Sequence, residues 1–228
     1  MAATDFWTWR DSFLGYRVYS ATAATNNGHN WVITDTSSAG TPTYATVDAA
    51  TDNSIGAVAI DMDTQAEVQN VCLSWNDVLT LDIDKITEIA FRIKMNQAAV
   101  DATTSVAFGL CSDRNDAIDS LAVHSSFRVI GADSTTNVVV ETDDATTDND
   151  DVATGQTLIN AYKICRISFA AGTDDVRFFV DGQAVATGTT FDMSGATTNL
   201  QPYLQLQKTS DANANGVTLS DVLITGRY

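Results

Sequence analysis

Carboxylates are the side chains of this sequence that could most readily do chemistry, because a pair of them can hydrolyse a glycosidic bond. A retaining glycosidase holds two carboxyl groups about 5 Å apart. The three glutamates lie far from one another, at positions 67, 88 and 141. In AIDMDTQAE (59–67), Asp61 and Asp63 would share one face of a strand. We expect these aspartates to end a strand and enter a turn, so the sequence predicts no catalytic pair.

A second group of carboxylates could hold a metal ion. The run ETDDATTDNDD (141–151) contains five aspartates and Glu141, and hard oxygen ligands of this kind suit Ca²⁺. The run lacks the D-x-D-x-D-G spacing, and no basic residue occurs between Arg128 and Lys163. We therefore expect a solvated, mobile loop, with a Ca²⁺ site as the alternative. No other metal and no cofactor is expected, since no Cys/His cluster has zinc spacing.

The sequence offers few residues for histidine-based catalysis. The two histidines are His29, in an Asn/Gly-rich turn, and His124, just before a strand-like run. Neither accompanies a recognisable nucleophile, and no glycine-rich phosphate loop is present. We expect both histidines to be placed by chance and the protein not to be an enzyme.

Charge and cysteine content narrow the possible partners. The chain has 12 Lys+Arg against 29 Asp+Glu, a formal charge of -17, which would repel nucleic acid and anionic membranes. Cys72, Cys111 and Cys165 each lie among apolar or small residues, which favours buried free thiols and synthesis in a reducing cytoplasm. No secretory signal is recognisable at the N-terminus, and no apolar run is long enough to span a membrane.

The elements that must position these residues are short β-strands. The run ITEIAFRIKM (86–95) alternates polar and apolar residues, and about a dozen similar runs follow one another with only two prolines. In DDVRFFVDGQAVATG (174–188), Asp181-Gly182 predicts a type I′ hairpin, with Val176, Phe178 and Val180 on one face. The sequence predicts an all-β sandwich forming a single domain over residues 16–228, with one or two helical turns within 115–123.

Aromatic residues gather ahead of this domain, in residues 1–15. The stretch FWTWRDSF contains Phe6, Trp7, Trp9, Arg10 and Phe13. Aromatic and arginine side chains are enriched in interface hot spots, so these residues could form an arm that docks on a neighbouring subunit. They could equally form an edge strand folded back on their own domain. Trp31 and Trp75 are expected in the core or at strand ends.

The run from Tyr162 to Thr187 resembles the hairpin of the concanavalin A-like lectin/glucanase superfamily, which includes laminin-G-like jelly rolls. AYKICRISFA, a turn and VRFFVDGQAVAT follow the pattern of that hairpin, and the ending from Leu200 to Tyr228 is also similar. The resemblance implies a jelly-roll β-sandwich of two antiparallel sheets. Glucanases of the superfamily use a Glu-x-Asp-x-(x-)Glu strand, which this chain lacks, and fold alone specifies no activity.

An acidic jelly roll rich in Thr, Ala and Asp also resembles structural proteins of tailed-phage particles. This resemblance implies a non-enzymatic capsid decoration (cement) protein, made in the host cytoplasm and bound as a homotrimer to the major capsid protein on the virion surface. A carbohydrate-binding module of a phage fibre or adhesin, which would bind a glycan, is the alternative. A glycan hydrolase is the third hypothesis. It ranks behind the other two because the chain lacks the pair of glutamates that hydrolysis would use.

Overall fold

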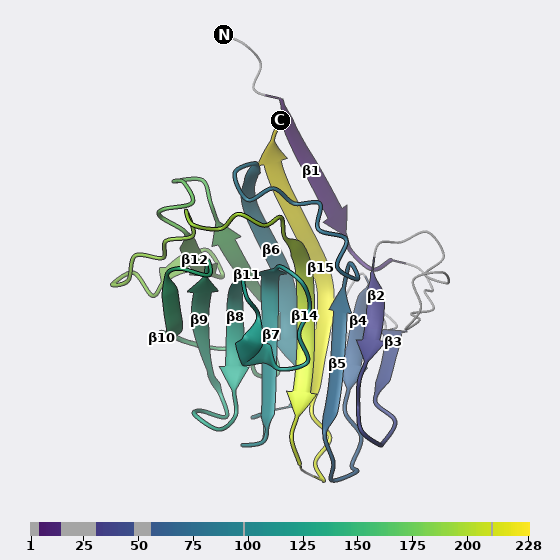
Figure 1. Ribbon diagram of the computed structural model, residues 1–228. Helices are drawn as coiled ribbons and strands as arrows, with labels where there is room; N and C mark the ends of the chain where they lie inside the picture. The colour runs from purple at the N-terminus through teal and green to yellow at the C-terminus, as the bar shows by residue number, and fades with distance from the viewer. Residues whose placement is uncertain (1–4, 15–30, 48–55, 98, 211) are drawn as a thin grey trace.

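The protein is a sandwich of two antiparallel sheets in a computed structural model that describes residues 5–14, 31–47, 56–97, 99–210 and 212–228 (Figure 1). The eight-stranded sheet has the order β13 (Gln183–Val185), β12 (Arg177–Val180), β11 (Lys163–Ser168), β6 (Ile86–Met95), β15 (Gly216–Arg227), β4 (Ala57–Asp61) and β3 (Thr43–Val47), and β1 (Phe6–Asp11) pairs with the second half of β15. The seven-stranded sheet has the order β10 (Asp148–Thr157), β9 (Asn137–Asp143), β8 (His124–Ile130), β7 (Thr104–Cys111), β14 (Gln201–Lys208), β5 (Gln69–Ser74) and β2 (Val32–Asp35).

This architecture confirms the predicted all-β jelly-roll class. The strand predicted over 86–95 is β6, and its alternate residues Ile89, Phe91 and Ile93 are fully buried. A 3-10 turn, η2 (Ile118–Ser120), is the helical element found within 115–123. Residues 16–30, which begin the predicted domain and include His29, lie outside the described residues. No described helix is long and apolar enough to cross a membrane.

The core lies between the two sheets and contains a continuous row of phenylalanines. Phe91 of β6 contacts Phe108 of β7, which stacks on Phe127 of β8, with ring centroids 5.4 Å apart in both pairs. Phe127 then meets Phe178 of β12 at 5.3 Å, and Phe178 meets Phe191 at 4.9 Å. All five rings are buried, so this row joins strands of both sheets.

The hairpin predicted at 174–188 is formed by β12 and β13. Val180 pairs with Gln183, which leaves Asp181 and Gly182 as a two-residue turn. Both turn residues have positive φ, 49° and 81°, as a type I′ turn requires. The Asp181 carboxylate also accepts hydrogen bonds from Lys163 Nζ at 2.7 Å and from the Ile164 N–H at 2.9 Å, which ties the turn to β11.

Replacing Gly182 by alanine is expected to lower the free energy of unfolding by about 1 kcal/mol, because an L-residue with a Cβ is disfavoured at positive φ. No atom lies within 4 Å of the added Cβ, so the loss would come from the backbone alone. Gly188→Ala is the matched control, since Gly188 has equal space without a positive φ. Denaturant unfolding of both variants measures the difference, and equal effects would contradict the turn assignment.

Candidate functional site

The outer face of the seven-stranded sheet is partly covered by the segment 112–123. In β7, Phe108 faces the core whereas Ala107 and Cys111 belong to a second apolar cluster on the opposite face. Ile118 and Leu121 of the segment pack into that second cluster. Gln205 Nε2 of β14 donates to the carbonyl oxygens of residues 115 and 116, at 3.0 and 3.2 Å. The segment therefore covers the middle of this face. The end of the sheet formed by β8, β9 and β10 lies next to the covered part.

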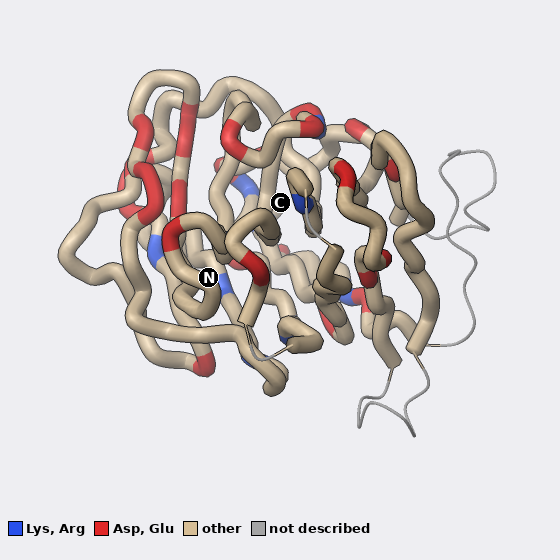
Figure 2. The backbone as a smooth tube through the Cα atoms, turned by 90° about the horizontal axis from the view of Figure 1, so that it is seen from below, with Lys and Arg blue, Asp and Glu red and all other residues tan. Residues whose placement is uncertain are grey.

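At that end lies a cavity of about 360 Å³, hereafter the acidic cavity. Its lining has ten residues, of which three are His124, Arg128 and Ile130 and seven are the acidic residues Asp119, Asp133, Glu141, Asp143, Asp148, Asp150 and Asp151. Figure 2 shows acidic positions gathered at the side of the sandwich where β9 and β10 lie, on the left of the view. Such a lining favours ligands that donate hydrogen bonds or carry positive charge.

The inner part of the acidic cavity is a buried charged network of three residues. His124, Arg128 and Glu141 are 3%, 4% and 3% exposed. The two carboxylate oxygens of Glu141 have different partners: His124 Nε2 lies 2.9 Å from Oε1, and an Arg128 Nη1 hydrogen bond reaches Oε2. Arg128 also donates to Asp119 and lies 3.5 Å from Asp151. Burying charge costs free energy, which marks this network as a candidate site and not a surface ion pair.

The tautomer of His124 decides whether its contact with Glu141 is a hydrogen bond. Its Nδ1 lies 3.2 Å from the carbonyl oxygen of Leu121, which can only accept, so Nδ1 carries a hydrogen. The contact between Nε2 and Glu141 is then a hydrogen bond only when the pair holds a further proton on the imidazole or on the carboxyl group. Burial lowers the pKa of His124, and the Asp143 carboxylate acts in the opposite direction.

The acidic run 141–151 was predicted to be a loop, but it forms parts of two paired strands and the turn between them. Glu141 lies in β9, residues 148–151 begin β10, and a tight turn joins the two strands. The Asp144 carboxylate orders this turn by accepting hydrogen bonds from the N–H groups of Thr146, Thr147 and Gly195, at 2.8, 2.6 and 2.8 Å. The prediction was wrong because backbone hydrogen bonds can hold a polar segment as an edge strand even when its side chains form no apolar face.

The possible metal ligands of the run come together in part. Oxygens of Glu141, Asp148 and Asp150 lie within 4.8 Å of one another, as a cation site would require. Burial raises the pKa of Asp148, and the neighbouring Asp150 and Asp143 raise it further. Burial also raises the pKa of Asp151, and the Arg128 guanidinium opposes this shift. Glu141, however, already uses both oxygens within the protein.

The other two carboxylates considered for catalysis, Asp61 and Asp63, lie at a strand end and in the turn after it, as predicted. Asp61 ends β4 and accepts a hydrogen bond from Asn96 Nδ2 at 2.9 Å. Asp63 follows in a turn and accepts from the N–H groups of Thr41 and Gln65, at 2.5 and 2.8 Å. These contacts hold the pKa of Asp63 below its usual value. Asp61 and Asp63 therefore anchor a strand end and a turn.

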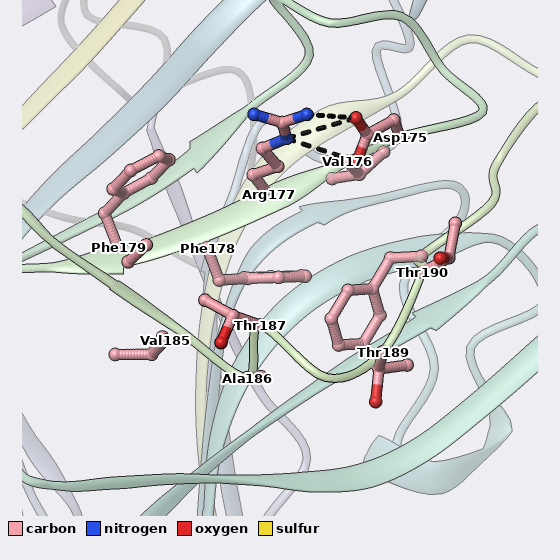
Figure 3. Close-up of a pocket in the computed structure, with 12 residues that line it drawn as sticks. Asp175, Val176, Arg177, Phe178, Phe179, Val185, Ala186, Thr187, Thr189 and Thr190 are labelled. Atoms are coloured by element: carbon pink, nitrogen blue, oxygen red, sulfur yellow. Dashed lines mark hydrogen bonds and ion pairs between the residues drawn. The ribbon is translucent and has the colours of Figure 1, made fainter.

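A second cavity, of about 350 Å³, lies under the β12–β13 hairpin (Figure 3) and is called the hairpin cavity. Phe178 and Phe191 supply buried aromatic surface, and threonine side chains 187, 189 and 190 line it as well. Arg177 and Asp175 form an exposed ion pair beside it. The charges of this pair cancel, so the hairpin cavity is largely apolar and neutral, unlike the acidic cavity.

The aromatic residues of the N-terminal stretch lie in and beside an edge strand of their own domain. β1 pairs with β15, and Arg10 forms an ion pair with Asp221 at 2.8 Å. Trp7 and Trp9 are partly buried against the core, and Phe13 is fully buried. Phe6 alone of the five predicted docking residues combines an aromatic ring with high exposure, 59%.

The remaining tryptophans and the cysteines lie where the sequence predicts. Trp31 is fully buried and Trp75 is 8% exposed, and both rings contact Trp9, at 6.0 and 5.1 Å between centroids. Trp31 Nε1 donates to Asp11 at 3.1 Å. The three cysteines are free and buried. Cys72 and Cys111 belong to the cluster under segment 112–123, and Cys165 belongs to the main core.

Sequence comparison identifies no relative, since no family model and no curated protein sequence matches the chain. Comparison of structures does find similar folds. The catalytic domain of an endo-1,3-beta-glucanase (laminarinase) from Thermotoga petrophila RKU-1 is similar with a TM-score of 0.58 and 9% identity, over 98% of each chain. The Emp47p carbohydrate recognition domain is similar with a TM-score of 0.56 and 10% identity, over 88% of this chain and 91% of the other. The carbohydrate esterase vb_24B_21 from Shiga toxin-encoding bacteriophage phi24B is similar with a TM-score of 0.51 and 14% identity, over 96% and 100%.

These similarities define the class of fold. The chain has the concanavalin A-like lectin/glucanase fold, as the pattern of residues 162–187 predicts. At identities of 9% to 14% the likeness concerns the fold alone, and the function has to be argued from the site.

Proposed function

We propose that this chain is a lectin-like carbohydrate-binding module without catalytic activity, and that its saccharide binds in the acidic cavity. The observation that carries the proposal is the buried His124–Glu141–Arg128 network beside an open, carboxylate-lined cavity. Carboxylates accept hydrogen bonds from sugar hydroxyl groups. The cavity volume of about 360 Å³ falls at the small end of the range for ligand pockets. The names of the similar structures, a carbohydrate recognition domain, a laminarinase and a carbohydrate esterase, support a saccharide as the ligand.

The contacts of Glu141 support binding over hydrolysis. Glu141, Asp148 and Asp150 lie close enough for the carboxyl spacing of a retaining glycosidase. A nucleophile, however, needs an oxygen free to attack, and each oxygen of Glu141 is held by His124 or by Arg128. Burial raises the pKa of Asp148, and the neighbouring Asp150 carboxylate raises it further. Steady turnover of a β-glucan by the protein would overturn the non-enzymatic assignment.

Asp150→Asn is expected to weaken glycan binding about tenfold, because a hydrogen bond to a charged acceptor contributes more than one to a neutral amide. A glycan array identifies the ligand, and titration calorimetry then compares the variant with the wild-type protein. Asp175→Asn is the matched control, since Asp175 lines the hairpin cavity instead. A loss caused by Asp175→Asn but not by Asp150→Asn would move the binding site to the hairpin cavity.

A second candidate function is capsid decoration, in which the module binds the major capsid protein on the surface of a virus particle. Exposed aromatic groups at one end of the sandwich favour it: Phe6 is 59% and Tyr228 is 83% exposed, and the Arg227 guanidinium lies 5.7 Å from the Phe6 ring. This combination of residue types is common in interface hot spots. A protein that binds no glycan but co-sediments with assembled capsid shells would favour this candidate.

A further inference from the structure

We propose that the outer face of the eight-stranded sheet holds an oxyanion-binding site centred on Arg92, and that its ligand is an acidic saccharide bearing a carboxylate or sulfate group. This site is separate from the acidic cavity and does not depend on the function proposed above. Three features carry it. An aromatic ring stacks on the Arg92 guanidinium, a β-bulge positions that guanidinium, and its charge has no ion-pair partner among the described residues.

The first feature is the stacking of Arg92 on an aromatic ring. Its guanidinium carbon Cζ lies over the Tyr162 ring, 3.8 Å from the ring centroid. Lys94 Nζ lies 4.9 Å from the same centroid, so two cations share one ring. Stacking uses the flat face of a guanidinium and leaves the N–H groups at its edge to bind a carboxylate or sulfate through two parallel hydrogen bonds.

The second feature is a β-bulge in β15 that holds one edge of the same guanidinium. The register of β15 against β6 shifts between Leu219 and Asp221, which makes Ser220 the extra residue. Ser220 is 1% exposed, and its hydroxyl oxygen accepts a hydrogen bond from Arg92 Nη1 at 2.6 Å. The hydroxyl also donates to the Arg92 carbonyl oxygen, at 3.3 Å. Bulges often re-aim a side chain beside a functional site, and this one fixes Arg92.

The third feature is the unbalanced charge of Arg92. Among the described residues, no carboxylate forms an ion pair with it. Its register partner on β15, Asp221, is instead held by Arg10 through hydrogen bonds of 2.8–3.2 Å. An oxyanion would supply the missing counter-charge. The formal charge of -17 opposes an anion at long range, but charges more than about 8 Å away are largely screened at physiological ionic strength.

The surroundings of Arg92 favour a saccharide over a peptide. Strand β6 lies between β11 and β15, so its backbone groups are already paired and a peptide could not add to it as a strand. Ile164, the register partner of Arg92 on β11, is 52% exposed and offers an apolar surface to the C–H groups of a sugar ring. Arg166, also on β11, stacks on Phe179 at 3.9 Å and pairs with Glu88. An acidic sugar matches this strip of apolar surface beside cations.

The test compares three dimers by titration calorimetry: galacturonic acid, sulfated galactose and neutral galactose, all with the same linkage. We expect at least one of the acidic dimers to bind about tenfold more tightly than the neutral one, the factor that one charge-assisted hydrogen bond supplies. The difference between the two acidic dimers shows whether a carboxylate or a sulfate is preferred. High salt should reduce the preference over the neutral dimer. Equal affinity for all three dimers, or no binding of either acidic dimer, would overturn the proposal.

Variants of Arg92 locate the site. Arg92→Gln should abolish the preference for an acidic dimer, and Arg92→Lys should weaken binding about tenfold, because lysine keeps the charge but loses the paired N–H geometry. Arg177→Gln is the matched control, since it removes the same charge from an exposed position in the same sheet and should leave the preference unchanged. Equal losses in Arg92→Gln and Arg177→Gln would show general attraction to positive charge and overturn the site.

Two further probes and one variant separate this proposal from its alternatives. Inorganic sulfate that binds as tightly as the acidic dimers would indicate an adventitious ion only, and a glutamate dipeptide that does so would indicate an acidic protein partner. Either result would overturn the saccharide assignment. Asp150→Asn, which tests the acidic cavity, should leave the affinity for acidic dimers unchanged. Loss of acidic-dimer binding in Asp150→Asn but not in Arg92→Gln would overturn the Arg92 site and leave the function proposed above standing.

Discussion

Replacing Arg128 by methionine is expected to lower the free energy of unfolding by about 3–5 kcal/mol, because removal of one partner leaves a buried charge uncompensated. Arg128 is 4% exposed and contacts the carboxylates of Asp119 and Glu141. Glu141 is itself buried, so its carboxylate could not replace the guanidinium with water. Urea unfolding at constant pH, followed by circular dichroism, measures the loss.

The matched control for this variant is Arg177→Met. Arg177 also pairs with a carboxylate, that of Asp175, but its side chain is 58% exposed, so we expect no measurable change in stability. Adding Glu141→Gln to Arg128→Met removes the uncompensated charge and should recover part of the loss. An Arg128→Met protein as stable as the Arg177→Met protein would show that the buried network does not exist in solution.

Replacing Phe127 by alanine is expected to cost about 3–5 kcal/mol of unfolding free energy, the range for removing a buried aromatic ring. Phe127 is fully buried, and its ring contacts Phe108 in its own sheet and Phe178 in the opposite sheet. The substitution therefore leaves a cavity at the contact between the two sheets. Thermal and denaturant unfolding of the variant provide the measurement.

Phe127→Leu should lose less stability than Phe127→Ala, since leucine fills more of the space. Phe6→Ala removes the same ring from an exposed position and should change the stability little. Losses of similar size at the buried and the exposed phenylalanine would contradict the position of Phe127 between the sheets.

The strands that the sequence predicts are those with one apolar face. In β6 and in the β12–β13 hairpin, alternate residues are buried, and the period of two shows this directly. Strand β10 was missed for a physical reason. It pairs only with β9 among the described strands, has no continuous buried face, and has two register shifts along its length. Its acidic residues therefore produce no periodic apolar signal.

The candidate site could not be predicted from the sequence, because it depends on the register between strands. Ser126 of β8 pairs with Glu141 of β9, which places Glu141 between His124 and Arg128 on the adjacent strand. No local pattern fixes that register. The available signal was weaker: Arg128 and Glu141 are charged residues inside otherwise apolar or small strand segments. Such residues in a strand predict a buried pair, but not which residue completes it.

The aromatic N-terminal stretch shows a different limit of prediction from sequence. The spacing of Trp7 and Trp9 would place both rings on one face of a strand. It does not specify whether that face packs on its own domain or on a neighbour, since both choices bury the same side chains. The pairing of β1 with β15 and the contact of Trp9 with Trp75 determine it here.

The distribution of the three thiols gives the protein internal reporters of local opening. Burial raises the pKa of Cys72 to about 12, and burial also raises the pKa values of Cys111 and Cys165. An alkylating reagent therefore meets almost no thiolate until the surrounding structure opens. Cys72 and Cys111 pack under segment 112–123, so lifting of that segment would expose them, whereas Cys165 lies in the main core and would require the two layers to separate. Labelling rates at these positions would therefore read the free energy of a local fluctuation and that of global unfolding separately, within one unmodified chain.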